Sequence, residues 1–84
     1  MNLEQMRMQI DVIDDKILQL LEQRMDIAKM IGYKKKINNT NILCQDRENE
    51  ILNKLDKKSN LDKIFIKTIW REIMNYSKII QSLN

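Results

Sequence analysis

The sequence of 84 residues contains no proline, no histidine, one glycine and one cysteine. β-Hairpin turns and glycine-rich phosphate loops are built largely from glycine and proline at fixed positions. Gly32 alone cannot supply them, so we expect neither a sheet architecture nor a Rossmann or P-loop domain. Apolar residues make up 43% of the chain and charged residues 32%. This mixture predicts a folded domain and argues against a disordered chain.

The missing histidines and cysteines also restrict the chemistry. With Cys44 as the only cysteine, the chain can form no internal disulfide, no zinc site and no Cys/His or Ser/His nucleophile pair. Any activity must therefore use arginine, lysine, carboxylates and neutral polar groups. A lone thiol suits a reducing compartment. No apolar run approaches the roughly 18 residues of a membrane span, and the first residues do not form a signal peptide. We expect a cytoplasmic protein without a membrane partner.

The charge is +3, with 15 basic and 12 acidic residues. Lys34, Lys35 and Lys36 form the one basic run, and most other basic residues alternate with acids, as on a solvated helix face. We therefore expect no nucleic-acid partner. A basic dimer that binds nucleic acid is the alternative, and salt-dependent binding would reveal it.

A long amphipathic helix is predicted for the first part of the chain. Its seam, at alternating steps of three and four, consists of Leu3, Met6, Ile10, Ile13, Ile17, Leu20, Arg24, Ile27 and Ile31. The pattern continues past Gly32 through Lys35, so we expect this helix to end at about Ile37 and to be followed by a loop over residues 38–41.

Two further helices are predicted. The second has Asp46 as its N-cap, ends near Lys58, and carries Ile51, Leu52 and Leu55 on its apolar face. The third has Ser59 or Asn60 as its N-cap, with Asp62 completing a capping box. Its apolar stripe consists of Leu61, Phe65, Ile69, Ile73, Ile80 and Leu83. The expected fold is all-α, with three helices in the order long, short, long, and with residues 1–84 in a single domain.

The length of the first helix predicts a dimer. About 35 residues at 1.5 Å each span roughly 52 Å. A compact chain of this size has a radius of gyration near 12 Å and a diameter of about 30 Å. Half of the apolar seam would therefore lie in water unless a second copy covered it. We predict an obligate, intertwined helical homodimer.

The strongest functional signal is a charged residue in the apolar seam. Arg24 occupies a seam position, and Lys35 lies on nearly the same helix face, with Cα atoms about 16 Å apart. Two long cationic side chains that lean toward each other would leave room for a small dicarboxylate. The alternative is that Arg24 pairs with an acid such as Asp26 or Glu48 and that Lys35 is a solvated charge.

Arg7 cannot reach Arg24 within one chain, because it lies about 25 Å away along the helix axis and about 100° around it. In an antiparallel dimer, however, the start of one long helix can lie beside the later part of its partner. By itself, Arg7 is typical of a surface residue.

Polar residues in the other two helices are also candidates. Ser77 and Gln81 are four residues apart, so they share a face next to the apolar stripe. They could bind a ligand or could satisfy a core contact. Arg47 and Glu48 lie at the start of the second helix, where the N-terminus favours anions. Exposed charges in a first helical turn are common, so this pair alone carries little weight.

Taken together, these residues closely resemble the all-helical chorismate mutase family over nearly the whole chain. The matching pieces are Arg7, the stripe leading to Arg24, the run Ile31-Gly32-Tyr33-Lys34-Lys35, the segment Asp46-Arg47-Glu48, and Ser77 with Gln81. The resemblance implies a three-helix protomer in an intertwined dimer with two equivalent sites. Each site would take its side chains from one chain, with one arginine from the partner: Arg24, Lys35, Arg47, Glu48, Ser77, Gln81 and the partner's Arg7.

The resemblance also implies the reaction. The family converts chorismate to prephenate by an intramolecular Claisen rearrangement on the route to phenylalanine and tyrosine. This reaction needs no nucleophile, proton shuttle, metal or cofactor, so we expect none. The protein must hold a flexible dianion in the reactive chair and stabilise the negative charge that grows on the ether oxygen.

Residue roles follow from the same resemblance. Arg7 and Arg24 would bind the two carboxylates, because a planar guanidinium binds a carboxylate through two hydrogen bonds. Lys35 and Gln81 would flank the ether oxygen as hydrogen-bond donors. The expected catalytic residues are these two and Arg24. Glu48 would accept a hydrogen bond from the ring hydroxyl, and Arg47 would support the electrostatics. Ser77 would contact a carboxylate or the ring.

One position departs from the family pattern. Cys44 stands where members often carry an acidic residue just before the second helix, and a thiol is a poor acceptor. Recognition of the ring hydroxyl would then rest more on Glu48, or a shifted loop would bring Asp46 into this role. Substrate affinity is the property that the departure affects.

Two other readings compete with a mutase. Isochorismate pyruvate lyase has a similar fold and also places a lysine beside the breaking ether bond, but Arg47 and Ser77 suit the mutase pattern better. A non-catalytic dimerisation module needs only the long apolar seam. The module predicts that leucine at position 24 is stabilising and harmless, whereas the enzyme predicts lost activity.

Overall fold

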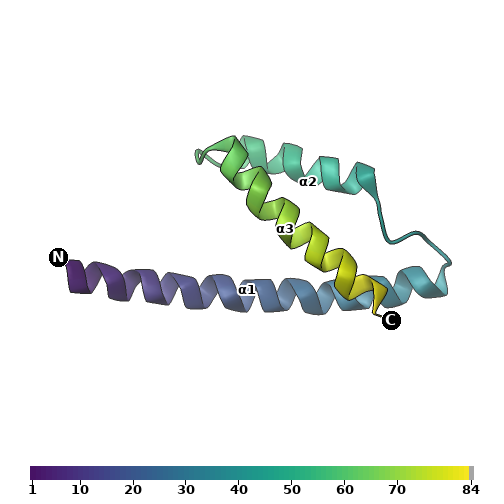
Figure 1. The fold of residues 1–84 in the computed structure, drawn as a ribbon, viewed down its shortest axis with the longest axis horizontal. Coiled ribbons are helices and arrows are strands. Elements are labelled where there is room, and N and C mark those ends of the chain that lie inside the picture. Colours follow the sequence, from purple (N-terminus) through teal and green to yellow (C-terminus); the bar gives the residue numbers. More distant parts are fainter. Residues whose placement is uncertain (84) are drawn as a thin grey trace.

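The computed structural model describes residues 1–83, which form three α-helices joined by two loops (Figure 1). The helices are α1, Leu3–Ile37, α2, Gln45–Lys58, and α3, Lys63–Ser82. No strand occurs within residues 1–83. The all-helical class and the order long, short, long are therefore confirmed.

The long helix α1 ends where the sequence predicts, and its start has a capping box. Asn2 is the N-cap, and its side chain accepts a hydrogen bond from the backbone nitrogen of Gln5 at 2.9 Å, while the Gln5 side chain accepts from the Asn2 nitrogen at 3.0 Å. This reciprocal pair satisfies backbone donors that the first helical turn leaves unpaired. The helix continues through Gly32 and ends at Ile37. The three lysines of its last turn stabilise the helix, because the C-terminal end carries the negative pole of the helix dipole.

The starts of α2 and α3 differ from the predictions. Cys44, not Asp46, is the N-cap of α2, and Asp46 lies in its first turn, where the helix dipole favours a carboxylate. Asp62 is the N-cap of α3, because its carboxylate accepts from the backbone nitrogen of Phe65 at 2.9 Å. Ser59 ends α2, and its hydroxyl accepts from the Leu61 nitrogen in a local turn. The predicted capping box at Ser59 or Asn60 was therefore wrong.

The buried face of α3 is also rotated relative to the predicted stripe. The side chains that α3 buries are Ile66, Met74, Ser77 and Gln81. Leu61, Phe65 and Leu83 of the predicted stripe are exposed in a single chain. The prediction failed because α3 carries apolar residues on more than one face, and periodicity alone does not say which face meets α1.

Helix α3 crosses the C-terminal half of α1, and α2 packs on α3 (Figure 1). Ala28 and Gly32 are the buried residues of α1, and they share one face because they are four residues apart. Small side chains at these positions allow another element to approach closely. Among the described residues, α1 and α2 do not pack on each other. The space between these two helices becomes the pocket described below.

The N-terminal half of α1 extends beyond the rest of the molecule (Figure 1). The chain measures 55 × 25 × 15 Å. Its radius of gyration is 16.0 Å, whereas a compact chain of this length would have about 12 Å. Residues 1–20 are all exposed, and their apolar seam includes Ile13 and Ile17, each about half exposed. The buried apolar side chains of the described residues are only Ala28, Ile66 and Met74. A single copy therefore has a very small core.

No helix within residues 1–83 has an apolar stretch long enough to cross a membrane.

Candidate active site

A pocket of about 400 Å³ lies between the three helices and the loop that joins α1 to α2. Six of the predicted site residues line it, and they come from all three helices: Arg24, Lys35, Arg47, Glu48, Ser77 and Gln81. The apolar part of the wall includes Ile27, Ile31, Ile51 and Met74. Such a cavity, mostly apolar with a few converging polar groups, is typical of a small-molecule site.

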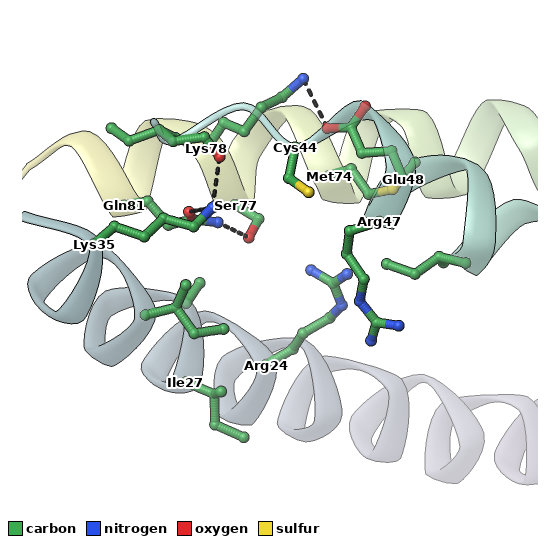
Figure 2. Close-up of a pocket in the computed structure, with 14 residues that line it drawn as sticks. Arg24, Ile27, Lys35, Cys44, Arg47, Glu48, Met74, Ser77, Lys78 and Gln81 are labelled. Carbon is green, nitrogen blue, oxygen red and sulfur yellow. Dashed lines mark hydrogen bonds and ion pairs between the residues drawn. The ribbon is translucent and has the colours of Figure 1, made fainter. Parts of the chain in front are cut away.

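A chain of hydrogen bonds links α1 and α3 at one end of the pocket (Figure 2). The Nζ atom of Lys35 donates to Oε1 of Gln81 at 3.0 Å and to the backbone oxygen of Ile42 at 2.6 Å. The Nε2 atom of Gln81 donates to Oγ of Ser77 at 3.3 Å. Ser77 and Gln81 are buried, with exposed fractions of 7% and 9%. These contacts hold the polar groups in place before any ligand enters.

Two arginines lie together at the other end of the pocket. Figure 2 shows the guanidinium groups of Arg24 and Arg47 side by side, one from α1 and one from α2. Burial lowers the pKa of Arg24 from its usual value, and the charge of Arg47 lowers this pKa further. Arg47 is held on its outer side by an exposed ion pair with Glu50, whose Oε1 lies 2.6 Å from Nη1. Because two like charges repel at close range, this end of the pocket favours an anion.

A third part of the pocket wall contains an ion pair that the sequence did not predict. Nζ of Lys78 lies 3.0 Å from Oε2 of Glu48, and both side chains are largely buried. Lys78 also lines the pocket. Its position offered a signal, because it lies four residues after Met74 and so faces the same way as a buried side chain. The expected alternative, in which Glu48 pairs with Arg24, is not what the structure shows.

The two residues near the family's acidic position lie on different sides of α2. Cys44 lines the pocket with its thiol, and its side chain makes no capping hydrogen bond. Asp46 lies at a shallow depression on the outer surface of α2 and does not line the pocket. The loop therefore does not bring Asp46 into the site.

Arg7 lies outside this pocket. It is exposed, near the start of α1, in the part of the helix that extends away from α2 and α3. Within one chain the structure thus brings together six of the seven predicted residues and leaves Arg7 apart. Among residues 1–83, no group of three or more His, Cys, Asp or Glu side chains is placed to hold a metal ion.

The arrangement is suited to bind a small anion and to stabilise developing negative charge. Four cationic side chains and one carboxylate line the pocket, and two neutral polar groups accompany them. The cations come from both ends, so a ligand with two separated carboxylates would meet a positive charge at each. Fixed donors in a largely apolar cavity act more strongly on a growing charge than they would in water.

Comparisons with known proteins agree with this picture. A family model for chorismate mutase type II matches residues 6–82. A bifunctional chorismate mutase/prephenate dehydratase from Aquifex aeolicus (strain VF5) is 43% identical over 53 residues, which cover 63% of this chain and 15% of that relative. The matched segment is thus a small part of the relative's length.

A solved structure is similar over nearly the whole chain. It is a conserved hypothetical protein from Pyrococcus furiosus, with a TM-score of 0.80 and 34% sequence identity, and the match covers 94% of this chain and 93% of the other. The fold and the family match therefore span the same three helices. Since the family model covers almost all of the described residues, this chain belongs to the chorismate mutase type II family.

Proposed function

We propose that this chain is a chorismate mutase, which converts chorismate to prephenate in the biosynthesis of phenylalanine and tyrosine. The observation that carries the proposal is the pairing of Lys35 with Gln81 at one end of a pocket whose other end holds Arg24 and Arg47. Family membership supports the same conclusion. The rearrangement is intramolecular, so the protein needs only to hold the substrate and to stabilise its transition state.

The arginines bind the substrate's carboxylates. Arg24 is partly desolvated, and this strengthens its attraction for an anion, because less water screens the two charges and the anion has less water to displace. The second carboxylate goes to the partner's Arg7. Arg47 adds to the positive potential but stays bonded to Glu50, so its contribution is smaller.

The donors next to the ether oxygen lower the barrier. Lys35 has three N–H bonds, of which two are directed at Ile42 and Gln81, and the third remains for the substrate. Gln81 lies beside it and is held by Ser77. As the C–O bond breaks, negative charge grows on the ether oxygen, and a fixed ammonium group stabilises this charge more than it stabilises the ground state.

The ring is recognised by the remaining polar groups. Glu48 accepts a hydrogen bond from the ring hydroxyl, and Ser77 contacts a carboxylate or the ring. Cys44 contributes little to this recognition because a thiol accepts hydrogen bonds weakly.

The active form is an intertwined homodimer with two equivalent sites. The support is the exposed apolar seam in the first 20 residues of α1, together with the small core of one chain. A partner's α1 that runs antiparallel would cover this seam and would carry its own Arg7 toward the pocket. Residues 1–84 then act as one catalytic unit that is complete only in the dimer.

The first experiment mixes the purified protein with chorismate, follows the loss of its ultraviolet absorbance and identifies the product. We expect prephenate from the wild type and none from Arg24→Ala. Pyruvate released from isochorismate, without turnover of chorismate, would indicate the lyase. Failure with both substrates would leave a dimerisation module as the function of this chain.

A further inference from the structure

The ion pair between Lys78 and Glu48 has no role in the reaction as proposed above. It joins the first turn of α2 to the last turns of α3, with 3.0 Å between Nζ and Oε2. The exposed fractions of the two side chains are 29% for Lys78 and 19% for Glu48. The pair is therefore largely screened from solvent, unlike the open pair between Arg47 and Glu50, whose side chains are more than half exposed.

The position of this pair is important because α2 is held from one side only. Within residues 1–83, α2 packs on α3 and not on α1. The wall that Glu48 contributes to the pocket is thus fixed relative to Ser77 and Gln81 through the contact with α3. A charged pair at the pocket end of this contact ties the Glu48 side chain to the helix that carries those two residues.

The surroundings of Glu48 make recognition of the ring hydroxyl depend on the orientation of this one side chain. Cys44 lines the same pocket but is only a weak acceptor for a hydrogen bond from a hydroxyl group. Glu48 is also the one carboxylate among the residues that line the pocket. Left unpaired, it would take several rotamers and would repel a dianionic substrate.

We propose that Lys78 is a positioning residue that holds the Glu48 carboxylate at the pocket wall, ready to accept the substrate's ring hydroxyl, and that offsets its negative charge. A carboxylate has about four acceptor positions, so one bond to Lys78 leaves room for another donor. In Figure 2 the Lys78 ammonium lies beyond Glu48, away from Arg24, so it acts on the substrate through Glu48. This inference rests on the proposed mutase function.

The test is a double-mutant cycle on chorismate turnover. Lys78→Met keeps the length of the side chain but removes its charge, and we expect KM to rise about tenfold while kcat changes less than about threefold. Lys78→Arg keeps the pair, so its KM should stay near that of the wild type. Glu48→Gln should raise KM by itself, and adding Lys78→Met to it should raise KM little further, since the two residues act as one unit.

Two controls separate positioning from a general structural effect. Lys67→Met alters an exposed lysine on the same helix outside the pocket, and its kinetics should match the wild type. Far-ultraviolet circular dichroism and the elution volume report whether each variant folds and assembles. If Lys78→Met fails either check, Lys78→Gln replaces it in the cycle.

Three results would overturn the inference while leaving the mutase function intact. The first is independent, multiplying effects of the Lys78 and Glu48 substitutions. The second is an arginine variant as impaired as the methionine variant. The third is a loss in kcat as large as that of Lys35→Ala, which would make Lys78 a catalytic group. A wild type without turnover would instead overturn the proposed function, and the role of Lys78 with it.

Discussion

The ammonium group of Lys35 lies 3.0 Å from the side-chain oxygen of Gln81, although 46 residues separate them in the chain. One residue stands in the last turns of α1 and the other in the last turns of α3. The contact exists because α3 crosses α1 at this end (Figure 1). The relative position of the two proposed catalytic donors therefore depends on this helix crossing. We expect substitutions of Lys35 or Gln81 to affect catalysis more than folding.

Lys35→Ala should lower kcat by about two orders of magnitude or more, because it removes the charge that stabilises the ether oxygen in the transition state. The thermal midpoint should fall only slightly, through loss of the contact to Ile42. Steady-state kinetics and a circular dichroism melt measure the two effects. Lys36→Ala, at the neighbouring exposed lysine, is the matched control. A decrease of less than tenfold in kcat would remove Lys35 from this role.

Arg24→Leu should abolish turnover and leave the fold as stable as before or more stable. The reason is that Arg24 is partly desolvated and lies beside Arg47, so its charged form is disfavoured in the free protein. Replacing it with leucine extends the apolar seam. We expect the thermal midpoint to be unchanged or to rise by roughly a few degrees. Full activity in this variant would instead remove Arg24 from the proposed site.

Ile13→Glu should dissociate the dimer and reduce the helical signal, because it puts a charge in the middle of the exposed seam of α1. A buried, unpaired charge at an interface costs several kcal/mol, which is comparable to the stability of a small domain. Sedimentation at micromolar concentration measures the assembly. Gln19→Glu, on another face of α1, should sediment as the wild type does. A wild-type monomer that keeps its full helicity would contradict the dimer.

Mixing two inactive variants should restore activity if Arg7 acts across the dimer. In a heterodimer of Arg7→Ala with Arg24→Ala, one site has both arginines intact and the other has neither. Random exchange makes half of the dimers mixed, so about one quarter of the wild-type activity should return. The assay follows chorismate turnover after the two proteins have exchanged subunits. No recovery, despite exchange shown by a size tag on one variant, would place both arginines in the same chain's site.

Cys44→Asp should stabilise the protein and lower KM. Cys44 is the N-cap of α2 without a side-chain capping bond, and an aspartate there would accept from the first-turn backbone nitrogens. Such a cap contributes about 1 kcal/mol, which corresponds to a rise of about 4–8 °C in Tm for a domain of this size. The carboxylate would also add an acceptor to the pocket. Cys44→Ala is the control and should change neither quantity much.

Sequence reasoning located the helices better than their caps. The period of the α1 seam and the absence of a breaker up to Ile37 predicted that helix to its last residue. The caps of α2 and α3 were misassigned because several nearby side chains can act as caps, and only the backbone path decides which one does. Asp62 became the cap of α3 because Ser59 is used in the preceding turn.

By itself, the sequence determined an all-helical chain with an arginine in its apolar seam, and it marked the polar residues that line the pocket. The tertiary structure alone decided which face of α3 is buried, because both faces carry apolar residues and the crossing with α1 chooses between them. It also decided the partner of Glu48. The sequence suggested Arg24 as a partner for Glu48, but α2 packs on α3 rather than on α1, and this packing selects Lys78.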